Sequence, residues 1–183
     1  MDEEADAAAP RHQRDRRLQR LRIQRREQQE EVEAAVLEGD RAQRTLADLL
    51  RDHGERGDRC AVEVGPHRLV GLITHLGEDL VRVQAASGSS WDVALLQVGA
   101  VAREQAGRAV HAVGRGHPRS LLARARELAG EEAVVEVGRL DRPDPVRGRL
   151  VAVSGELLEL DRGRAGSVVV AWWVVAWLAA DPG

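Results

Sequence analysis

The chain has 183 residues, of which 43% are hydrophobic and 31% are charged, and its formal net charge is -3. This length allows one ordinary domain or two small ones. The small net charge excludes a general attraction to nucleic acid or to an anionic membrane surface, so any such binding must be local. The lone Cys60 excludes an internal disulfide, and no apolar signal segment follows the acidic start. We therefore expect a cytoplasmic protein.

Arginine dominates the N-terminal segment, where RHQRDRRLQRLRIQRR spans residues 11–26. The sign of the charge then reverses through EQQEEVEAAVLEGD, and because the composition is helical throughout we expect a charged helical arm over residues 1–39. A basic helix can lie along phosphates and release their counterions, which makes RNA or DNA a candidate partner. The alternative is a solvated helix that is balanced by its acidic half or paired with a second copy. The arginines of the nucleic-acid hypothesis are Arg11, Arg14, Arg16, Arg17, Arg20, Arg22, Arg25 and Arg26.

The chain from residue 40 onward predicts two small domains. Two helical segments, RTLADLLRDHG from Arg44 and RSLLARARELAG from Arg119, each end near a glycine. Strand-like sequence follows each helix. We expect a first domain over residues 40–102, a linker over 103–117 and a second domain over 118–180.

Alternating apolar and charged residues predict the strands. VEV at residues 62–64 and LEL at 158–160 each place one face of a strand in a core and the other in solvent. GED at 77–79 and SGE at 154–156 predict tight turns between paired strands. Five short strands per domain close most economically as a small barrel, because closure removes exposed strand edges.

The second domain repeats the first. GLITHLGEDLVRV, which begins at Gly71, matches GRLVAVSGELLEL, which begins at Gly148, at an offset of 77 and without a gap. The same offset places WDVALLQVGAV on VVVAWWVVAWL. The motif VEVG begins at Val62 and again at Val135, an offset of 73, so we expect four extra residues in the following loop of the second copy.

A helix followed by five strongly bent strands, with Gly71, Ile73 and Leu80 at their present spacing, resembles the Sm-like (LSm) barrel family. The resemblance covers residues 44–101 and 119–178. It implies a mainly β protein of two tandem Sm-like (SH3-like) five-stranded barrels, each preceded by a helix. The chain is also similar to a group of uncharacterised two-barrel proteins from high-GC bacteria, so the resemblance implies a bacterial tandem-repeat protein.

The resemblance implies a fold more directly than it implies RNA binding. Gly77 and Val81 stand at positions where the family has the Asp and the Asn of its RNA-facing turn. The Arg-Gly or Lys-His signature of the family's second motif is also missing. Binding of RNA is therefore argued from the arginines of this chain and not from the family.

Three of the four tryptophans lie in the uncharged segment SVVVAWWVVAWLAA. A membrane-spanning helix needs about 20 residues and a lipid-facing strand alternates apolar with polar residues, so this segment predicts no membrane partner. It predicts two buried strands broken around Trp173. In the Sm-like family the fourth and fifth strands pair between neighbouring barrels, and we hypothesise that Trp172, Trp173 and Trp177 pack there against the first barrel or a second subunit. The alternative is that an exposed tryptophan stacks on bases.

The sequence predicts no catalytic or metal-binding constellation. The six histidines are scattered, no two stand at i and i+4 on a helix, and there is no cysteine cluster. GRGHPRS at 114–120 is a candidate anion nest with Arg115 and Arg119, or else a linker that ends where Pro118 begins a helix. We expect no cofactor and no enzyme activity. The expected function is non-catalytic binding of nucleic acid, and the alternative is a protein-only adaptor or assembly scaffold that uses the Trp-rich edge as its interface.

Overall fold

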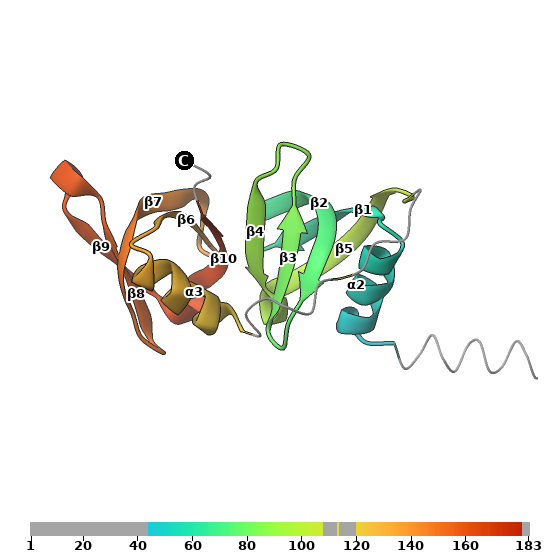
Figure 1. The fold of residues 1–183 in the computed structure, drawn as a ribbon, viewed down its shortest axis with the longest axis horizontal. Coiled ribbons are helices and arrows are strands. Elements are labelled where there is room, and N and C mark those ends of the chain that lie inside the picture. Colours follow the sequence, from blue (N-terminus) through green and yellow to red (C-terminus); the bar gives the residue numbers. More distant parts are fainter. Residues whose placement is uncertain (1–43, 108–112, 114–119, 181–183) are drawn as a thin grey trace, which may run out of the picture. The chain divides into compact units, whose positions relative to one another are not determined.

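The computed structural model describes residues 44–107, residue 113 and residues 120–180. The fold of these residues is mainly β, with two α-helices and ten strands (Figure 1). The helices are α2 (Leu46–Glu55) and α3 (Leu121–Gly130). The strands are β1 (Arg59–Val64), β2 (His67–Leu76), β3 (Leu80–Gln84), β4 (Ser90–Ala94), β5 (Val98–Gln105), β6 (Val134–Arg139), β7 (Arg142–Val153), β8 (Leu157–Asp161), β9 (Ser167–Ala171) and β10 (Val175–Ala180). Three short 3-10 helices complete the described elements: η1 (Leu95–Gln97), η2 (Gly163–Ala165) and η3 (Trp172–Val174).

The predicted arm over residues 1–39, with its eight arginines, lies outside the described residues, and so do Arg115 and Arg119. The helical arm and the anion nest therefore stay predictions. The described residues from Leu46 onward belong to one unit.

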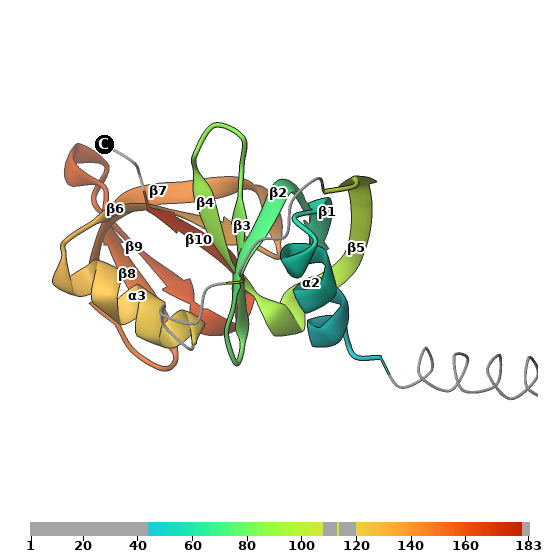
Figure 2. The ribbon, with the colours of Figure 1, turned by 45° about the vertical axis from the view of Figure 1, so that its right-hand side comes forward.

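The ten strands of the described part form one antiparallel sheet in the order β5-β1-β2-β3-β4-β10-β6-β7-β8-β9. We call residues 46–107 the first half and residues 121–180 the second half. The order within the first half, β5-β1-β2-β3-β4, is the same as the order β10-β6-β7-β8-β9 within the second. The halves are joined where β4 pairs with β10 (Figure 2). Strands β5 and β9 form the two ends of this open sheet.

The local predictions for helices and turns are confirmed. Both helices begin two residues after the arginines at which their predicted segments start, at Leu46 and Leu121. The GED and SGE turns lie between β2 and β3 and between β7 and β8. The uncharged segment forms two strands, β9 and β10, and η3 separates them. The prediction that both strands are buried is wrong for β9, which ends the sheet and has one buried residue among five, whereas five of the six residues of β10 are buried. The positions of these elements could be predicted because they depend on neighbouring residues, whereas the burial of β9 depends on which strands pair with it.

Two hydrophobic cores follow from the predicted alternation. Val62 and Val64 of β1 are fully buried while Glu63 between them is exposed, and Leu158 and Leu160 of β8 are likewise fully buried. Each core also takes residues from the other half. The first core includes Ala176, Trp177 and Ala179 of β10, and the second includes Leu80 of β3. The halves are therefore packed into one another at the β4–β10 pairing.

The predicted equivalence of the two VEVG motifs is wrong by two residues. Cys60 lies opposite Gly71, and Val135 lies opposite Gly148. Since the two glycines are equivalent at the offset of 77, Cys60 and Val135 occupy equivalent positions, yet their own offset is only 75. The second copy therefore has two extra residues rather than four, and they fall in β7 opposite a register shift in β6.

The glycines of the two VEVG motifs explain the misalignment. Gly65 lies in the β1–β2 turn at φ 54°, a conformation that favours glycine. Gly138 instead lies within β6, where an added Cβ would overlap the Trp177 ring. The motifs match in letters although their glycines meet different physical requirements.

Candidate interaction surface

Trp177 occupies the junction between the two halves. It is 4% exposed and lies on β10 opposite Val93 of β4 and Gly138 of β6. Its ring meets His67 edge to face, with 5.6 Å between the ring centroids. His67 Nε2 donates a hydrogen bond of 2.8 Å to the carbonyl oxygen of Arg139. The tryptophan therefore fills a space that both halves build.

A buried carboxylate fixes α3 to the first half. Asp92 of β4 is 4% exposed and accepts hydrogen bonds from Arg82 Nε at 2.7 Å and Arg82 Nη2 at 3.0 Å. The other half supplies a third donor, because Arg124 Nε of α3 lies 3.2 Å from Asp92 Oδ2. A buried carboxylate requires such partners, since desolvation of an unpaired charge is costly.

The N-terminus of α3 meets the first half as well. The amide of Leu121 donates to Asp79 Oδ1 at 2.7 Å, and Ser120 Oγ accepts from the amide of Ala123 at 3.1 Å. Both contacts satisfy amides that a helix leaves free in its first turn. Leu80, which follows Asp79, is 1% exposed and belongs to the same core as Leu121. We call Asp79, Leu80 and Asp92 the covered face of the first half.

The corresponding face of the second half lies exposed beside the edge strand β9. The repeat offset of 77 leads from the covered face to Glu156, Leu157 and Val169, which we call the open face. Leu157 is 36% exposed and Val169 is 58% exposed. Val169 lies opposite Glu159 of β8, as Asp92 lies opposite Arg82 of β3. The two faces thus have the same strand geometry and differ in what covers them.

The structure separates the three tryptophans that the sequence grouped as one interface. Trp177 lies in the junction, whereas Trp172 packs against the second core. Trp173 is 70% exposed, and both Trp172 and Trp173 lie in η3 rather than on a strand. Leu96 is the equivalent of Trp173 in the first half and is 90% exposed. The interface hypothesis for the three tryptophans stays a prediction.

Sequence reasoning missed the residues that hold the junction. Asp92, Arg82 and Arg124 belong to three different elements, and no local motif links them. The signal that could have found them is a comparison of the repeats, because Asp92 corresponds to Val169. A charged residue at one copy of a strand position and an apolar one at the other indicates different neighbours.

A second buried carboxylate, Asp58, ties α2 to β1 and to the end of β5. It is 2% exposed, and its Oδ2 lies 2.8 Å from His53 Nδ1 and 3.0 Å from Arg56 Nε. Its Oδ1 accepts the amide of Gly107 at 2.8 Å. Burial by itself raises the pKa of Asp58, but the hydrogen bonds from Gly107, His53 and Arg56 outweigh it and hold the pKa well below its usual range.

Cys60 lies beside this carboxylate and is fully buried. Burial, followed by the negative charge of Asp58, raises the pKa of the Cys60 thiol to about 11. A thiol with a raised pKa is a poor nucleophile at neutral pH. The hydrogen bonds within this group link the end of α2 to the start of β1.

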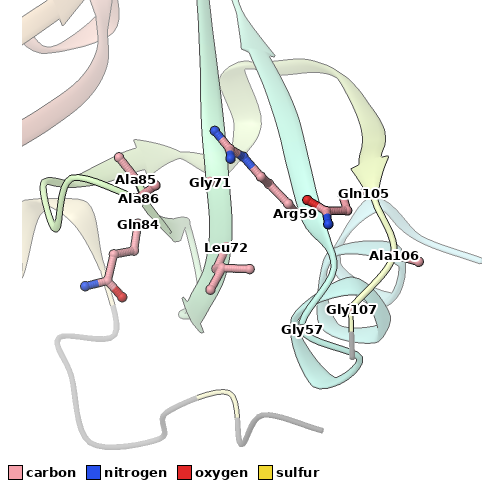
Figure 3. Close-up of a pocket in the computed structure, with 10 residues that line it drawn as sticks. All are labelled: Gly57, Arg59, Gly71, Leu72, Gln84, Ala85, Ala86, Gln105, Ala106 and Gly107. Atoms are coloured by element: carbon pink, nitrogen blue, oxygen red, sulfur yellow. The ribbon is translucent and has the colours of Figure 1, made fainter. Parts of the chain in front are cut away.

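A cavity of about 300 Å³ lies in the first half beside the middle of β2 (Figure 3). Arg59 and Gln105 stand on one side of it and Gln84 on the other. Arg59 is the one charged side chain among the ten residues that line the cavity. This lining offers one cation and two amides, and it offers no acid–base pair.

No family model matches the chain, and no curated protein matches it either. Among the described residues no cluster of histidine, cysteine, aspartate or glutamate is suited to hold a metal ion. The described helices are also too short and too polar for any of them to cross a membrane.

Proposed function

We propose that this chain is a non-catalytic binding protein, built of two Sm-like units in tandem, that acts as an assembly scaffold. The tandem arrangement is supported by the shared strand order and by shared registers. Leu80 lies opposite Ala94, and at the repeat offset of 77 Leu157 lies opposite Ala171. Two units that pair their strands in the same way are the expected product of a repeated sequence.

The single observation that carries the scaffold function is the open face. Val169 is a large apolar side chain that is mostly exposed, and Leu157, which is also exposed, lies on the next strand. Exposed apolar residues gathered at a sheet edge are typical of an interaction site, because an edge strand also presents unpaired backbone groups. The same face of the first half is already covered by protein.

A binding role is favoured over catalysis by the chemistry of the buried polar groups. Both oxygens of Asp58 and both oxygens of Asp92 are occupied by donors from the protein itself. The described cavity beside Arg59 adds no carboxylate or imidazole. The two buried carboxylates are thus engaged within the fold, and neither of them lines the cavity.

The scaffold function can be tested by placing a photo-crosslinking amino acid at Val169 in chains expressed in cells. We expect covalent protein adducts at this position, because a partner covers the open face. The matched control places the same group at Leu96, which is more exposed and lies away from that face, and we expect no adduct there. Failure of position 169 to give more adducts than position 96 would refute the scaffold function.

Nucleic-acid binding is the second candidate, and the arginine-rich segment favours it. Eight arginines within residues 11–26 provide the phosphate contacts that this function needs. In the described part of the chain Arg82 and Arg124 are both engaged by Asp92, and exposed arginines such as Arg142 and Arg164 lie on separate elements. The proposal therefore assigns nucleic acid to the arm and protein contacts to the sheet.

Fluorescence anisotropy with labelled RNA and DNA oligomers tests the second candidate. We expect binding that weakens steeply as salt rises, since counterion release drives it. A full-length variant with all eight arginines of residues 11–26 replaced by glutamine should lose this binding. Equal binding by the variant, or no binding by the natural chain at low salt, would exclude the arm as a nucleic-acid site.

A further inference from the structure

The junction provides a template for the open face. In the junction the covered face receives α3 through three contacts: Asp79 accepts the Leu121 amide, Leu80 shares a core with Leu121, and Asp92 binds Arg124. At the other end of the sheet, the open face presents the equivalent strand positions. The question is which helix could cover it.

Helix α2 is the equivalent of α3, and each of its bounds precedes that of α3 by an offset of 75. This offset makes Leu46 the equivalent of Leu121 and Leu49 the equivalent of Arg124. Both leucines are only partly buried in the first half. A copy of the junction would bring Leu46 to Leu157 and Leu49 to Val169.

The helix position and the strand position of this contact differ in the same way between the junction and the open face. In the junction, both members of one pair are charged, since Arg124 meets Asp92. At the equivalent positions both members are apolar, Leu49 on the helix and Val169 on the strand. Substitution on one side alone would leave a buried charge against an apolar residue, which is costly. The joint change keeps the two surfaces complementary.

The other helix contact is also preserved. Glu156 stands where Asp79 accepts the α3 amide, so the open face retains a carboxylate for the N-terminus of a helix. Glu156 is exposed. Each position of the open face thus has a suitable partner on α2. Glu156 can accept an amide at the helix N-terminus, Leu157 can pack against Leu46, and Val169 can pack against Leu49.

The two strand edges are compatible with the same arrangement. In the junction Trp177 lies opposite Val93, and Leu178 lies opposite Asp92. Their equivalents at the ends of the sheet are Ala100 and Val101 of β5 and Val170 and Val169 of β9. None of these four carries a charge. The charged residues of β5 come only later in that strand.

We propose that a second copy of this chain covers the open face, with its α2 on β8 and β9 and its β5 beside β9. The contact is head to tail, because different surfaces of the two copies meet. It therefore repeats from copy to copy and gives a ring if the rotation closes or a filament if it does not. This inference rests on the proposed scaffold function and names its partner.

Sedimentation velocity of the full chain over a range of concentrations tests the proposal. We expect masses that rise with concentration in multiples of the monomer. Val169→Asp should reduce the mass to that of the monomer, while Leu96→Asp should leave the assembly of the natural chain unchanged. A natural chain that stays monomeric at every concentration would overturn the proposal. An unchanged mass for Val169→Asp would overturn it as well.

Paired variants show whether the contact is head to tail. Leu49→Asp and Val169→Asp should each be monomeric and folded by circular dichroism, and an equimolar mixture should form a dimer and nothing larger, since each supplies the surface that the other lacks. Leu49→Arg combined with Val169→Asp in one chain reproduces the Arg124–Asp92 pair and should restore assembly. A mixture that remains monomeric, or a double variant that stays monomeric, contradicts the proposal.

The failure of this inference can be told apart from the failure of the scaffold function. Crosslinks from position 169 to a different protein, with a monomeric natural chain in sedimentation, would exclude a second copy and leave the scaffold function standing. If position 169 gave no more crosslinks than the Leu96 control, both the scaffold function and the second-copy proposal would be refuted.

Discussion

Strands β10 and β5 occupy equivalent places in the two halves and differ in their neighbours. β10 lies between β4 and β6, and five of its six residues are buried. β5 ends the sheet, is mostly exposed, and carries Arg103 and Glu104 near its end. A strand that is paired on both sides needs no charged residues to prevent unwanted pairing. An edge strand uses such residues to resist non-specific pairing. Equivalent strands thus diverge according to what covers them.

The side chains beneath these strands diverge in the same way. In the second half Trp177 of β10 lies opposite Gly138, while in the first half Ala100 of β5 lies opposite Glu63. A large ring over a glycine fills the space between two halves. A small residue beside a carboxylate suits a strand that has no further neighbour within its own chain. Substitutions at these contrasting positions should therefore differ in their effect on stability.

Replacing Trp177 with alanine should have the largest effect, because it removes a buried ring shared by both halves. We expect a loss of about 4 kcal/mol in the free energy of unfolding, within the range for large-to-small changes in cores. Trp173→Ala is the matched control, and since its ring is 70% exposed the loss should stay below about 0.5 kcal/mol. Urea unfolding measures both. Equal losses for the two variants would contradict the assignment of Trp177 to the junction.

Gly138→Ala should destabilise the chain by about 3 kcal/mol, because the new Cβ would overlap the Trp177 ring and over-packing is costly. The control is Gly99→Ala in β5, where the nearest atom to an added Cβ is 3.8 Å away. That change should be close to neutral. The midpoints of thermal unfolding compare the two variants. An unchanged midpoint for Gly138→Ala would contradict this prediction and show that the Trp177 ring can shift.

Asp92→Asn should cost about 2 kcal/mol, because Arg82 and Arg124 would lose hydrogen bonds to a charged acceptor in a mostly buried site. Asp161→Asn provides the comparison on the second half. Asp161 binds Arg149 at 2.8 Å in a partly exposed pair, so its loss should leave the unfolding midpoint nearly unchanged. Chemical denaturation of both variants checks this, and a larger effect at Asp161 would reverse the expected order.

Asp58 should give the fold an acid dependence. Its pKa is lowered in the folded chain, so its contribution to stability is complete above the ordinary aspartate range. That contribution is lost as the pH falls below that range, because the unfolded chain then binds a proton that the folded chain does not. Unfolding of the natural chain and of Asp58→Asn should differ at neutral pH and converge in acid. A constant difference across pH would contradict the lowered pKa.

Much of the local structure could be predicted from the sequence, because local patterns determine it. The VEV and LEL alternations predicted buried strands, and GED and SGE predicted turns. The local structure of Trp172 and Trp173 was harder to predict, since an unbroken apolar run does not show where a 3-10 helix interrupts it. The VEVG motifs were misleading because identical letters met different requirements at Gly65 and Gly138.

The two helices, the strand faces and the offset of 77 between the halves can be read from the amino-acid sequence, since propensity and periodicity act between near neighbours. The pairing of β4 with β10, the contact of Asp92 with Arg124 and the exposure of Val169 depend on the folded arrangement of the halves. These outcomes join residues that are far apart in the chain. Their free energy comes from burial and charge pairing that exist only after the halves have met.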